Sequence, residues 1–532
     1  MDLSGNLSRE QRLLIEGRSR EATKEWNKAV ETYHTLFEFF PDNLDYGLRQ
    51  ALDQDSAGRS IDALATVEAL RKLAAPARDD PRIDLAEAAA AGSLSDYQRA
   101  HAAAARAAQK GERAGARLLV ARARLADCWF YHRLGELDQA ITSCQSASDI
   151  YGKAGDRNNM AWALNNIANV AADEGDYVVA RKMYQESLAL FRQIGSKNCA
   201  AGALGNLANI LQYQGSLAAA KKMHEESLAL YREIGDTDDA TIEMVNIASV
   251  LLPEGDPDGA RKMSDQALAI SRGIGSKSTM ELALFNVGLA LYATGDLAGA
   301  KIRYDEGLAM AREIGDKHQA AYFLAGLGQI LTAKADLAAA QKKHEEALAI
   351  RSELREKVAI GESHLELAHL FLESGQAVLA EKLVQQTAAE LRSQKALDDE
   401  ASGQLLLARA FLAQGRLSEA QKAVERARMV SKGTENRETR LSVAITGARV
   451  QAASGRGSDK AQTIAVLEAV VAEAAKTRML HYEFEARLAL GEIEIKSGKT
   501  ATGRGSLARL EKDATAKGFR LIARKAAAAT KA

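Results

Sequence analysis

A spacing of forty residues runs through the middle of this chain and limits what it can fold into. Alanine recurs at Ala180, Ala220, Ala260, Ala300 and Ala340, and leucine follows eight positions later at Leu188, Leu228, Leu268, Leu308 and Leu348. Glycine marks the half-periods at Gly175, Gly215, Gly255 and Gly295, and again at Gly195, Gly235, Gly275 and Gly315. A fixed period of this length indicates supersecondary units stacked on one another instead of one globular core.

Each period contains the pattern of two helices. Leu164, Ile167 and Ala171 are separated by three and four residues, so they share one face of a first helix. Gly175 can adopt the positive φ that ends this helix, and Asp176 can cap the next one. The second helix carries Ala180, Tyr184, Leu188 and Phe191 on one side. Because each helix is short and apolar on one side only, stacking against neighbouring pairs has to supply its stability.

These positions resemble a known family, the tetratricopeptide repeat (TPR). The shared pattern is L-x2-[IL]-[AG] followed by A-x3-[YFH], in Leu164, Ile167, Ala168, Ala180 and Tyr184, in Leu204, Leu207, Ala208, Ala220 and His224, and in Leu284, Val287, Gly288, Ala300 and Tyr304. The 40-residue length is similar to the long repeats of kinesin light chains and of the C-terminal regions of bacterial serine/threonine kinases and winged-helix regulators. The resemblance implies an all-α fold, a right-handed superhelical α-solenoid of about 12 helical hairpins.

The regularity of the repeat divides the chain into three parts. In residues 1–118 the marker alanines, Ala29, Ala63 and Ala100, are 34 and 37 residues apart, which predicts irregular TPR-like units. Residues 119–435 hold the regular 40-residue array. In residues 436–532 the markers fade after Gly455, which indicates degenerate units and capping helices.

Charge and apolar pattern narrow the partners and the location. The chain has 70 basic and 71 acidic residues, a balance that argues against nucleic acid as a direct partner. No apolar run reaches the ~20 residues of a membrane span, and the opening MDLSGNLSREQ lacks the apolar core of a signal peptide. We therefore expect a cytoplasmic protein that does not bind membranes. The three cysteines, Cys128, Cys144 and Cys199, do not make a disulfide framework and are expected to be small buried apolar residues.

No pattern in the sequence predicts catalysis, a cofactor or a metal. The GKT at 498–500 is similar to the end of a phosphate-binding loop, but Ile493 stands where that loop needs glycine. His224 and His344 are each followed by two glutamates, but not by the second histidine four positions on that a zinc-binding helix requires. Both histidines occupy the ring position of the repeat, which predicts core packing. We expect no enzymatic activity, no catalytic residue and no metal site.

The resemblance implies that the first helices line a concave groove. On the unit described above it places Trp162, Asn165, Asn166, Asn169 and Asp173 on that side. Asn166 recurs as Asn206, Asn246 and Asn286, at the same place in four successive units. Since a carboxamide both donates and accepts hydrogen bonds, such a ladder can hold the backbone of an extended peptide. The alternative, in which each asparagine bonds a neighbouring helix, stays open.

The predicted groove has a polar zone and an apolar zone. The polar zone consists of Asn165, Asn166, Asn169, Asn206, Asn209, Gln212 and Tyr213, and the apolar zone of Leu282, Phe285, Leu289, Tyr292 and Tyr322. A peptide across both zones would be clamped by its backbone at one end and anchored by an apolar side chain at the other. A tight superhelix that buries the apolar zone is the alternative. The candidate binding residues are Trp162, Asn165, Asn166, Asn169, Asn206, Asn209, Tyr213, Asn246, Phe285, Asn286, Tyr292 and Tyr322.

We predict a non-catalytic TPR scaffold that binds protein or extended peptide partners in its concave groove and serves bacterial regulation or signalling. Residues 7–49 resemble the start of the repeat region in bacterial regulators, where that region follows a serine/threonine kinase or a winged-helix domain. The alternative is therefore a sensor or regulatory segment detached from such an output domain. The oligomeric state and the identity of the partner stay open.

Overall fold

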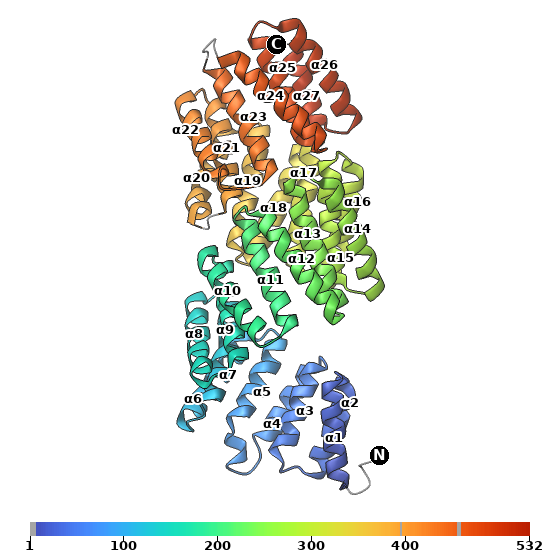
Figure 1. Cartoon of the computed structure of the whole chain (residues 1–532), viewed down its shortest axis with the longest axis vertical. Helices are drawn as coiled ribbons and strands as arrows, with labels where there is room; N and C mark the ends of the chain where they lie inside the picture. Colours follow the sequence, from blue (N-terminus) through green and yellow to red (C-terminus); the bar gives the residue numbers. More distant parts are fainter. Residues whose placement is uncertain (1–6, 394–395, 455–458, 532) are drawn as a thin grey trace. The chain divides into compact units, whose positions relative to one another are not determined.

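The structure, a computed structural model, describes residues 7–393, 396–454 and 459–531. This part of the chain contains 27 α-helices, one short 3₁₀ helix (Ala77–Asp79) and no β-strand. Consecutive helices form antiparallel hairpins (Figure 1), and the 27 helices make 13 pairs and one last helix. The predicted all-α solenoid is confirmed, with slightly more hairpins than expected.

The chain divides into two compact units. Unit 1 comprises Met1–Val170 and Glu186–Gly195, and unit 2 comprises Ala171–Gln185 and Ser196–Ala532. Unit 1 contains α1 (Arg9–Ala22), α2 (Trp26–Phe39), α3 (Leu44–Ser56), α4 (Ser60–Leu70), α5 (Pro81–Ser93), α6 (Tyr97–Arg113), α7 (Arg117–Leu134) and α8 (Leu137–Ala154). Helices α9 (Arg157–Asp173) and α10 (Tyr177–Gln193) contribute residues to both units. The division at residues 118 and 435 rests on repeat regularity and stays a prediction.

Unit 2 continues with seventeen helices in the same alternation. They are α11 (Lys197–Tyr213), α12 (Leu217–Ile234), α13 (Thr237–Glu254), α14 (Pro257–Ile274), α15 (Lys277–Ala293), α16 (Leu297–Ile314), α17 (Lys317–Ala333), α18 (Leu337–Glu353), α19 (Lys357–Glu373), α20 (Ala377–Ser393), α21 (Leu397–Ala413), α22 (Leu417–Ser431), α23 (Arg437–Ala453), α24 (Asp459–Lys476), α25 (Leu480–Lys496), α26 (Thr500–Ala516) and α27 (Arg520–Lys531). The odd-numbered helices are the first helices of the pairs. They carry the positions that the sequence assigned to the groove.

A left-handed residue and a polar cap separate consecutive helices, as the sequence predicts. Helix α12 ends at Gly235, whose φ is 78°, and the Asp236 side chain then accepts a hydrogen bond from the Asp239 amide. Where the repeat lacks this glycine, Ala335 and Arg355 adopt φ values of 61° and 59°. A left-handed backbone costs a non-glycine residue about 1–2 kcal/mol. Stacking of the hairpins therefore imposes the turn even where the residue disfavours it.

The repeated small and aromatic positions form the core of the stack. The marker alanines Ala180, Ala220, Ala260, Ala300 and Ala340 are at most 1% exposed. His224 and His344 are buried at the ring position, which confirms core packing. Each contacts a glutamate of the following helix: His224 Nδ1 lies 2.7 Å from Glu243 Oε2, and His344 Nδ1 lies 3.2 Å from Glu366 Oε2. The two histidines therefore tie one hairpin to the next.

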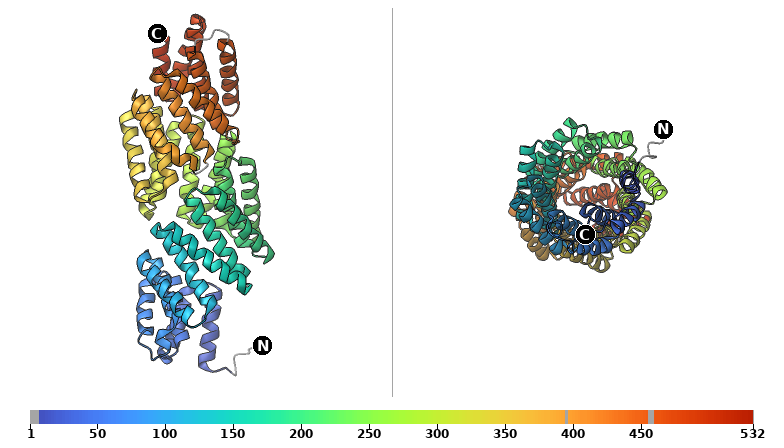
Figure 2. Two further views of the ribbon diagram at one scale, coloured as in Figure 1. Left: turned by 90° about the vertical axis from the view of Figure 1, so that its left-hand side faces the viewer. Right: turned by 90° about the horizontal axis from the view of Figure 1, so that it is seen from below.

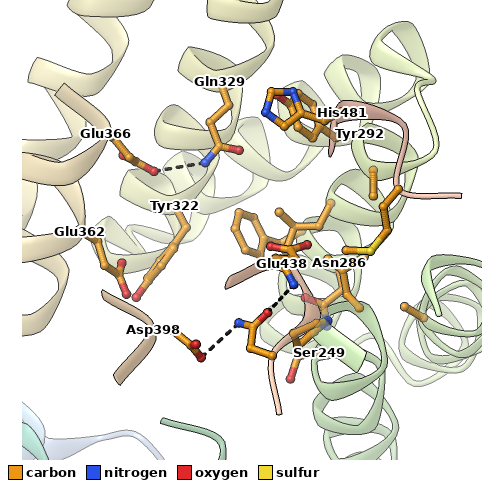
Figure 3. A pocket seen from close by; sticks show the side chains of 18 of the residues that line it. Ser249, Asn286, Tyr292, Tyr322, Gln329, Glu362, Glu366, Asp398, Glu438 and His481 are labelled. Atoms are coloured by element: carbon orange, nitrogen blue, oxygen red, sulfur yellow. Dashed lines mark hydrogen bonds between the residues drawn. The ribbon is translucent and has the colours of Figure 1, made fainter. Parts of the chain in front are cut away.

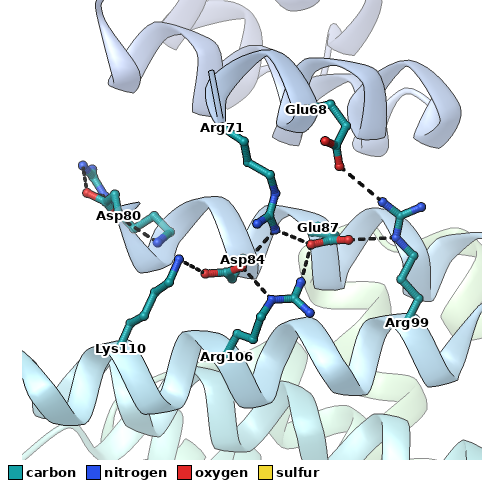
Figure 4. A network of polar contacts seen from close by, with 9 residues as sticks. Glu68, Arg71, Asp80, Asp84, Glu87, Arg99, Arg106 and Lys110 are labelled. Atoms are coloured by element: carbon teal, nitrogen blue, oxygen red, sulfur yellow. Dashed lines mark hydrogen bonds and ion pairs between the residues drawn. The ribbon is translucent and has the colours of Figure 1, made fainter. Parts of the chain in front are cut away.

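Unit 1 holds a buried charge cluster between its helices (Figure 4). Asp84 and Glu87 of α5 are buried, and cations of α6 reach them. Lys110 Nζ lies 2.7 Å and Arg106 Nε 3.1 Å from Asp84, while Arg99 Nε lies 2.8 Å from Glu87. Burial alone would raise the pKa of Asp84, but Lys110 and Arg106 hold it below its usual value. These ion pairs therefore join α5 to α6.

The cysteines depart from the prediction. Cys128 of α7 and Cys144 of α8 form a disulfide with their Cα atoms 5.3 Å apart. Both residues are buried, but the expectation of three apolar cysteines without a disulfide is wrong for this pair. The turn at Gly135 places the two residues opposite each other on antiparallel helices, although 16 positions separate them in sequence. Cys199 is unpaired and half-buried.

The late hairpins of unit 2 fold back onto its early hairpins. Helix α23 lies against α13, and α27 lies against α17 (Figures 1 and 2). The Glu435 amide donates to the Gly215 carbonyl at 2.9 Å, and Arg478 Nη1 lies 2.7 Å from Asp258 Oδ2. We call this set of contacts the seam: Gly215 with Glu435, Asp258 with Arg478, and Gly295 with Leu480. The coil of unit 2 therefore closes on itself around an interior space.

Candidate functional site

The interior of unit 2 contains a cavity of about 710 Å³, which adjoins a second lobe of about 910 Å³. Its wall consists almost entirely of odd-numbered helices, from α11 to α27. These are the first helices of the pairs. The seam brings α23 against α13 and α27 against α17, so the part of the predicted groove that lies in unit 2 is a partly open cavity.

The structure brings together seven of the twelve predicted groove residues. Asn209, Tyr213, Asn246, Phe285, Asn286, Tyr292 and Tyr322 line the cavity. Asn206 is half-buried and is not part of the lining. The other four, Trp162, Asn165, Asn166 and Asn169, lie in unit 1. That any of these residues binds a peptide stays a prediction.

The groove residues of unit 1 differ in exposure. Trp162 is 41% exposed and packs edge-to-face on Phe191, with ring centroids 5.6 Å apart. Asn165 is buried, whereas Asn166 and Asn169 are half-buried. The buried amide of Asn165 has little surface left for a ligand. The asparagines in this part of the predicted polar zone therefore differ in how accessible they are.

The asparagines of the ladder also differ in burial and hydrogen bonding within unit 2. Asn286 is buried, and its Nδ2 donates to the Val245 carbonyl of α13 at 2.9 Å. This bond to a neighbouring helix is the alternative that the sequence left open. Asn246 is half-buried and lines the cavity. Asn286 is therefore buried and bonded to a neighbouring helix, whereas Asn246 is only half-buried, although both occupy the same position of the repeat.

Aromatic side chains form one side of the cavity. Phe285 and Tyr322 meet edge-to-face with centroids 5.6 Å apart, and Phe285 lies 5.7 Å from Tyr304. Tyr292 lies 6.2 Å from Phe519 across the seam. Phe285, Tyr292 and Tyr322 are half-buried and keep surface toward the cavity. The predicted apolar zone is therefore only partly covered by neighbouring hairpins.

The opposite side of the cavity is acidic, which the sequence analysis did not predict. The carboxylates of the lining are Glu362, Glu366, Glu373, Asp398, Asp399, Glu438 and Glu485. Figure 3 shows Glu362, Asp398 and Glu438 facing the same space as Tyr322 and Asn286. Asp398 accepts hydrogen bonds from Thr439 at 2.7 Å and from Asn436 at 3.1 Å. This side of the wall thus offers mainly hydrogen-bond acceptors.

The acidic side chains differ in pKa because their surroundings differ. Burial, together with Glu362 and Asp398, raises the pKa of Asp399 to about 8. Burial raises the pKa of Glu438 to about 7. Burial would also raise the pKa of Glu366, but the hydrogen bond with His344 holds it below its usual value. Part of the wall therefore resists carrying its full negative charge.

The repeat register contained a signal for these residues. Position 162 of the first clear unit recurs as Tyr322 and, one period later, as Glu362. In the same way Asn286 is followed by Gly326 and then by Glu366. Extending the inner-wall positions beyond residue 322 would have found both glutamates. The late hairpins that complete the wall could not be found in this way, because their place depends on the seam.

Comparison with known proteins identifies the family. Residues 276–525 match the family described as MalT-like TPR region, and residues 130–193 and 199–273 match the family described as Tetratricopeptide repeat. The chain belongs to the tetratricopeptide-repeat superfamily. The concave surfaces of such helical repeats serve as extended binding surfaces. This TPR protein is thus a scaffold for protein interaction in the broad sense of its fold.

Two solved structures illustrate the likeness of this TPR protein to other helical repeats. A chain of the crystal structure of the APC/C hetero-tetramer Cut9-Hcn1 superposes with a TM-score of 0.56 at 11% identity, covering 99% of this chain and 96% of that chain. A chain of the Rap protein complexed with competence and sporulation factor gives a TM-score of 0.48 at 14% identity, covering 65% of this chain and 98% of that chain. At such identities the likeness concerns the fold alone. The comparison with curated proteins gave no match.

Membrane and metal features complete the description of the TPR chain. Among the described residues, no helix is both long enough and apolar enough to cross a membrane. Within the same ranges, histidine, cysteine and acidic side chains do not gather in threes in a way that could hold a metal ion.

Proposed function

We propose that the chain is a non-catalytic scaffold that binds an extended segment of a partner protein inside the cavity of unit 2. The observation that carries this proposal is the wall of first helices around a cavity of about 710 Å³. Sites for ligands of limited size typically measure about 300–1,000 Å³ and combine apolar walls with a few polar groups. The cavity therefore suits a short stretch of peptide more than a folded partner surface.

The lining offers the two kinds of contact that an extended peptide needs. Phe285, Tyr292 and Tyr322 form an aromatic side that can take an apolar anchor residue. Asn209 and Asn246 present carboxamides, which can pair with both the N–H and the C=O of a peptide backbone. Hydrogen bonds to the peptide backbone would bind peptides of many sequences, while the aromatic side would favour those with a suitable apolar residue.

A matched pair of variants tests this role. Asn246 lines the cavity, whereas Asn206 occupies the same position of the preceding repeat outside the lining. Random dodecapeptides displayed on phage are selected on the full-length protein, and the affinities of recovered peptides are measured by fluorescence anisotropy. We expect Asn246→Ala to weaken binding about fivefold, the value of one hydrogen bond. Asn206→Ala should leave the affinity unchanged.

Two results would contradict the proposal. One is the recovery of no specific peptide from the selection. The other is an equal loss of affinity in Asn206→Ala and Asn246→Ala, because binding would then not depend on the cavity wall. Thermal unfolding of both variants shows whether a loss of affinity reflects a loss of folding instead.

The role of the bound segment in the cell is a second part of the proposal. We place it in bacterial regulation or signalling, in the cytoplasm, where the scaffold would hold a regulated partner. In the alternative, the same cavity serves as the sensor of a serine/threonine kinase or winged-helix output domain. The neighbouring reading frames distinguish the two roles, since an adjacent output domain favours the alternative.

A further inference from the structure

The 710 Å³ lobe of the cavity is electrostatically one-sided. Its lining contains seven carboxylates and four histidines but no lysine or arginine, whereas the adjoining lobe also has Arg351, Arg409, Arg449 and Lys525 in its lining. The histidines are His318, His344, His369 and His481, and two of them already contact wall glutamates. A low-dielectric cavity lined mainly by one sign of charge concentrates ligands of the opposite sign.

Elsewhere on the same wall the chain neutralises its own carboxylates. Glu373 contacts Arg409 at 2.6 Å and also pairs with Lys525 of α27. Burial would raise the pKa of Glu373, but His369, Arg409 and Lys525 hold it far below its usual range. Cations from neighbouring hairpins are thus the means by which this wall keeps a buried carboxylate ionised.

Asp399 and Glu438 do not have such a cation. Within the described ranges Asp399 makes no ion pair or side-chain hydrogen bond, and the Glu438 side chain accepts one hydrogen bond, from the Tyr482 hydroxyl at 3.3 Å. Both line the cavity. Both side chains are half-buried, and a carboxylate that is partly removed from water without a counter-charge gains when a cation approaches.

Asn286 adds an acceptor to the same space. The residue is 8% exposed and lines the cavity, and its Nδ2 is committed to the Val245 carbonyl. Because a carboxamide accepts through its oxygen and donates through its nitrogen, Oδ1 is the atom left for a ligand. No donor among the described residues contacts this oxygen. The groups available to a ligand here are therefore hydrogen-bond acceptors: the amide oxygen of Asn286 and the carboxylates of Asp399 and Glu438.

We propose that the segment bound in the cavity presents an arginine or lysine side chain to Asp399 and Glu438. This inference rests on the proposed function and names the chemistry of its ligand. A guanidinium or ammonium group supplies the N–H donors and the positive charge that this part of the wall lacks. Arg351 already lies over the Tyr322 ring, 4.6 Å from its centroid, so the wall accommodates a guanidinium beside its aromatic side.

The peptide selection described above tests this inference when it is repeated on charge variants. The full-length protein, Asp399→Asn and Glu438→Gln are each used as bait at pH 7.5, and the recovered dodecapeptides are sequenced. Glu345→Gln, at an exposed site on α18, is the matched control for the change in net charge. We expect lysine and arginine to be enriched at one peptide position for the wild type and the control. Asp399→Asn should abolish that enrichment and weaken a selected basic peptide about tenfold.

A second measurement uses a single selected peptide and its analogues. Replacing the enriched basic residue by glutamine should weaken binding to the wild type about tenfold and binding to Asp399→Asn only slightly. Peptides that bind in the cavity, lose affinity in Asn246→Ala and show no preference for basic residues would overturn this inference and leave the proposed function standing. Failure to recover any specific peptide would overturn both.

Discussion

Replacing Glu281 by glutamine should stabilise the chain at pH 8 and leave its stability nearly unchanged at pH 5. Glu281 lies in the first half of α15 and is fully buried, and neither carboxylate oxygen has a hydrogen-bond partner among the described residues. The equivalent positions of other repeats are uncharged: Thr241 in the preceding repeat, and Ala161, Ala201, Ala321, Gly361 and Ala401 elsewhere. The glutamate is therefore a charge placed where the stack normally packs helices closely.

The size of the effect follows from the pKa of this group. Burial, with a smaller contribution from Asp316, raises the pKa of Glu281 from 4.5 to about 7. One pKa unit corresponds to about 1.4 kcal/mol. Because the folded state holds the proton more tightly than the unfolded state, the stability it contributes is complete below pH 4.5 and is lost as the pH rises through 7. The wild type should lose about 3 kcal/mol through this group, a loss that Glu281→Gln avoids.

Urea unfolding followed by circular dichroism measures this difference at pH 5, 6, 7 and 8 on both proteins. The free-energy difference between Glu281→Gln and the wild type should grow by about 2.5 kcal/mol across this range and level off above pH 7. Glu345→Gln, at an exposed site, controls for the loss of one negative charge. A difference that stays flat with pH would refute the argument, since it would mean that the site does not penalise the charged form.

The remaining predictions concern the seam and the cavity. Gly295→Ala should destabilise the chain about 1 kcal/mol more than Gly315→Ala in urea unfolding, because both residues have a positive φ but only at Gly295 does the added methyl meet Leu480. Equal losses would show that the seam does not depend on this contact. The affinity for a basic peptide should rise from pH 6 to pH 8, because burial and two neighbouring carboxylates raise the pKa of Asp399 to about 8. Burial also raises the pKa of Glu438 to about 7, so both groups contribute to the rise. Fluorescence titration checks this, and a rise that persists in the double variant Asp399→Asn/Glu438→Gln would contradict the assignment.

Much of the local structure follows from residues close together in the chain. Gly235 and Asp236 end one helix and cap the next as predicted, because a positive φ and an N-cap depend only on the turn itself. The burial of His224 was predicted from its place at the ring position of the repeat. Its glutamate partner was not predicted, because Glu243 belongs to the next helix.

The candidate site was predicted only in part. The inner-wall register grouped Asn246, Phe285 and Tyr322, and all three line one cavity, while their role in binding stays a prediction. It did not show that Asn286 bonds the carbonyl of a neighbouring helix, because that bond depends on the rotation between two hairpins. Nor did it show the acidic side of the cavity, which needs both the later periods and the closing of the coil.

The sequence alone determined the period, the helix pairs, their turns and the face of each first helix that turns inward. Tertiary structure decided where the coil of unit 2 meets itself, with Arg478 against Asp258 from a position 220 residues earlier. Where the coil meets itself depends on the sum of many small rotations between stacked hairpins, and the sequence of a single repeat does not determine that sum. The carboxylates Glu438 and Glu485 belong to the late hairpins, so the acidic side of the cavity depends on the folding of unit 2 as well as on residue type.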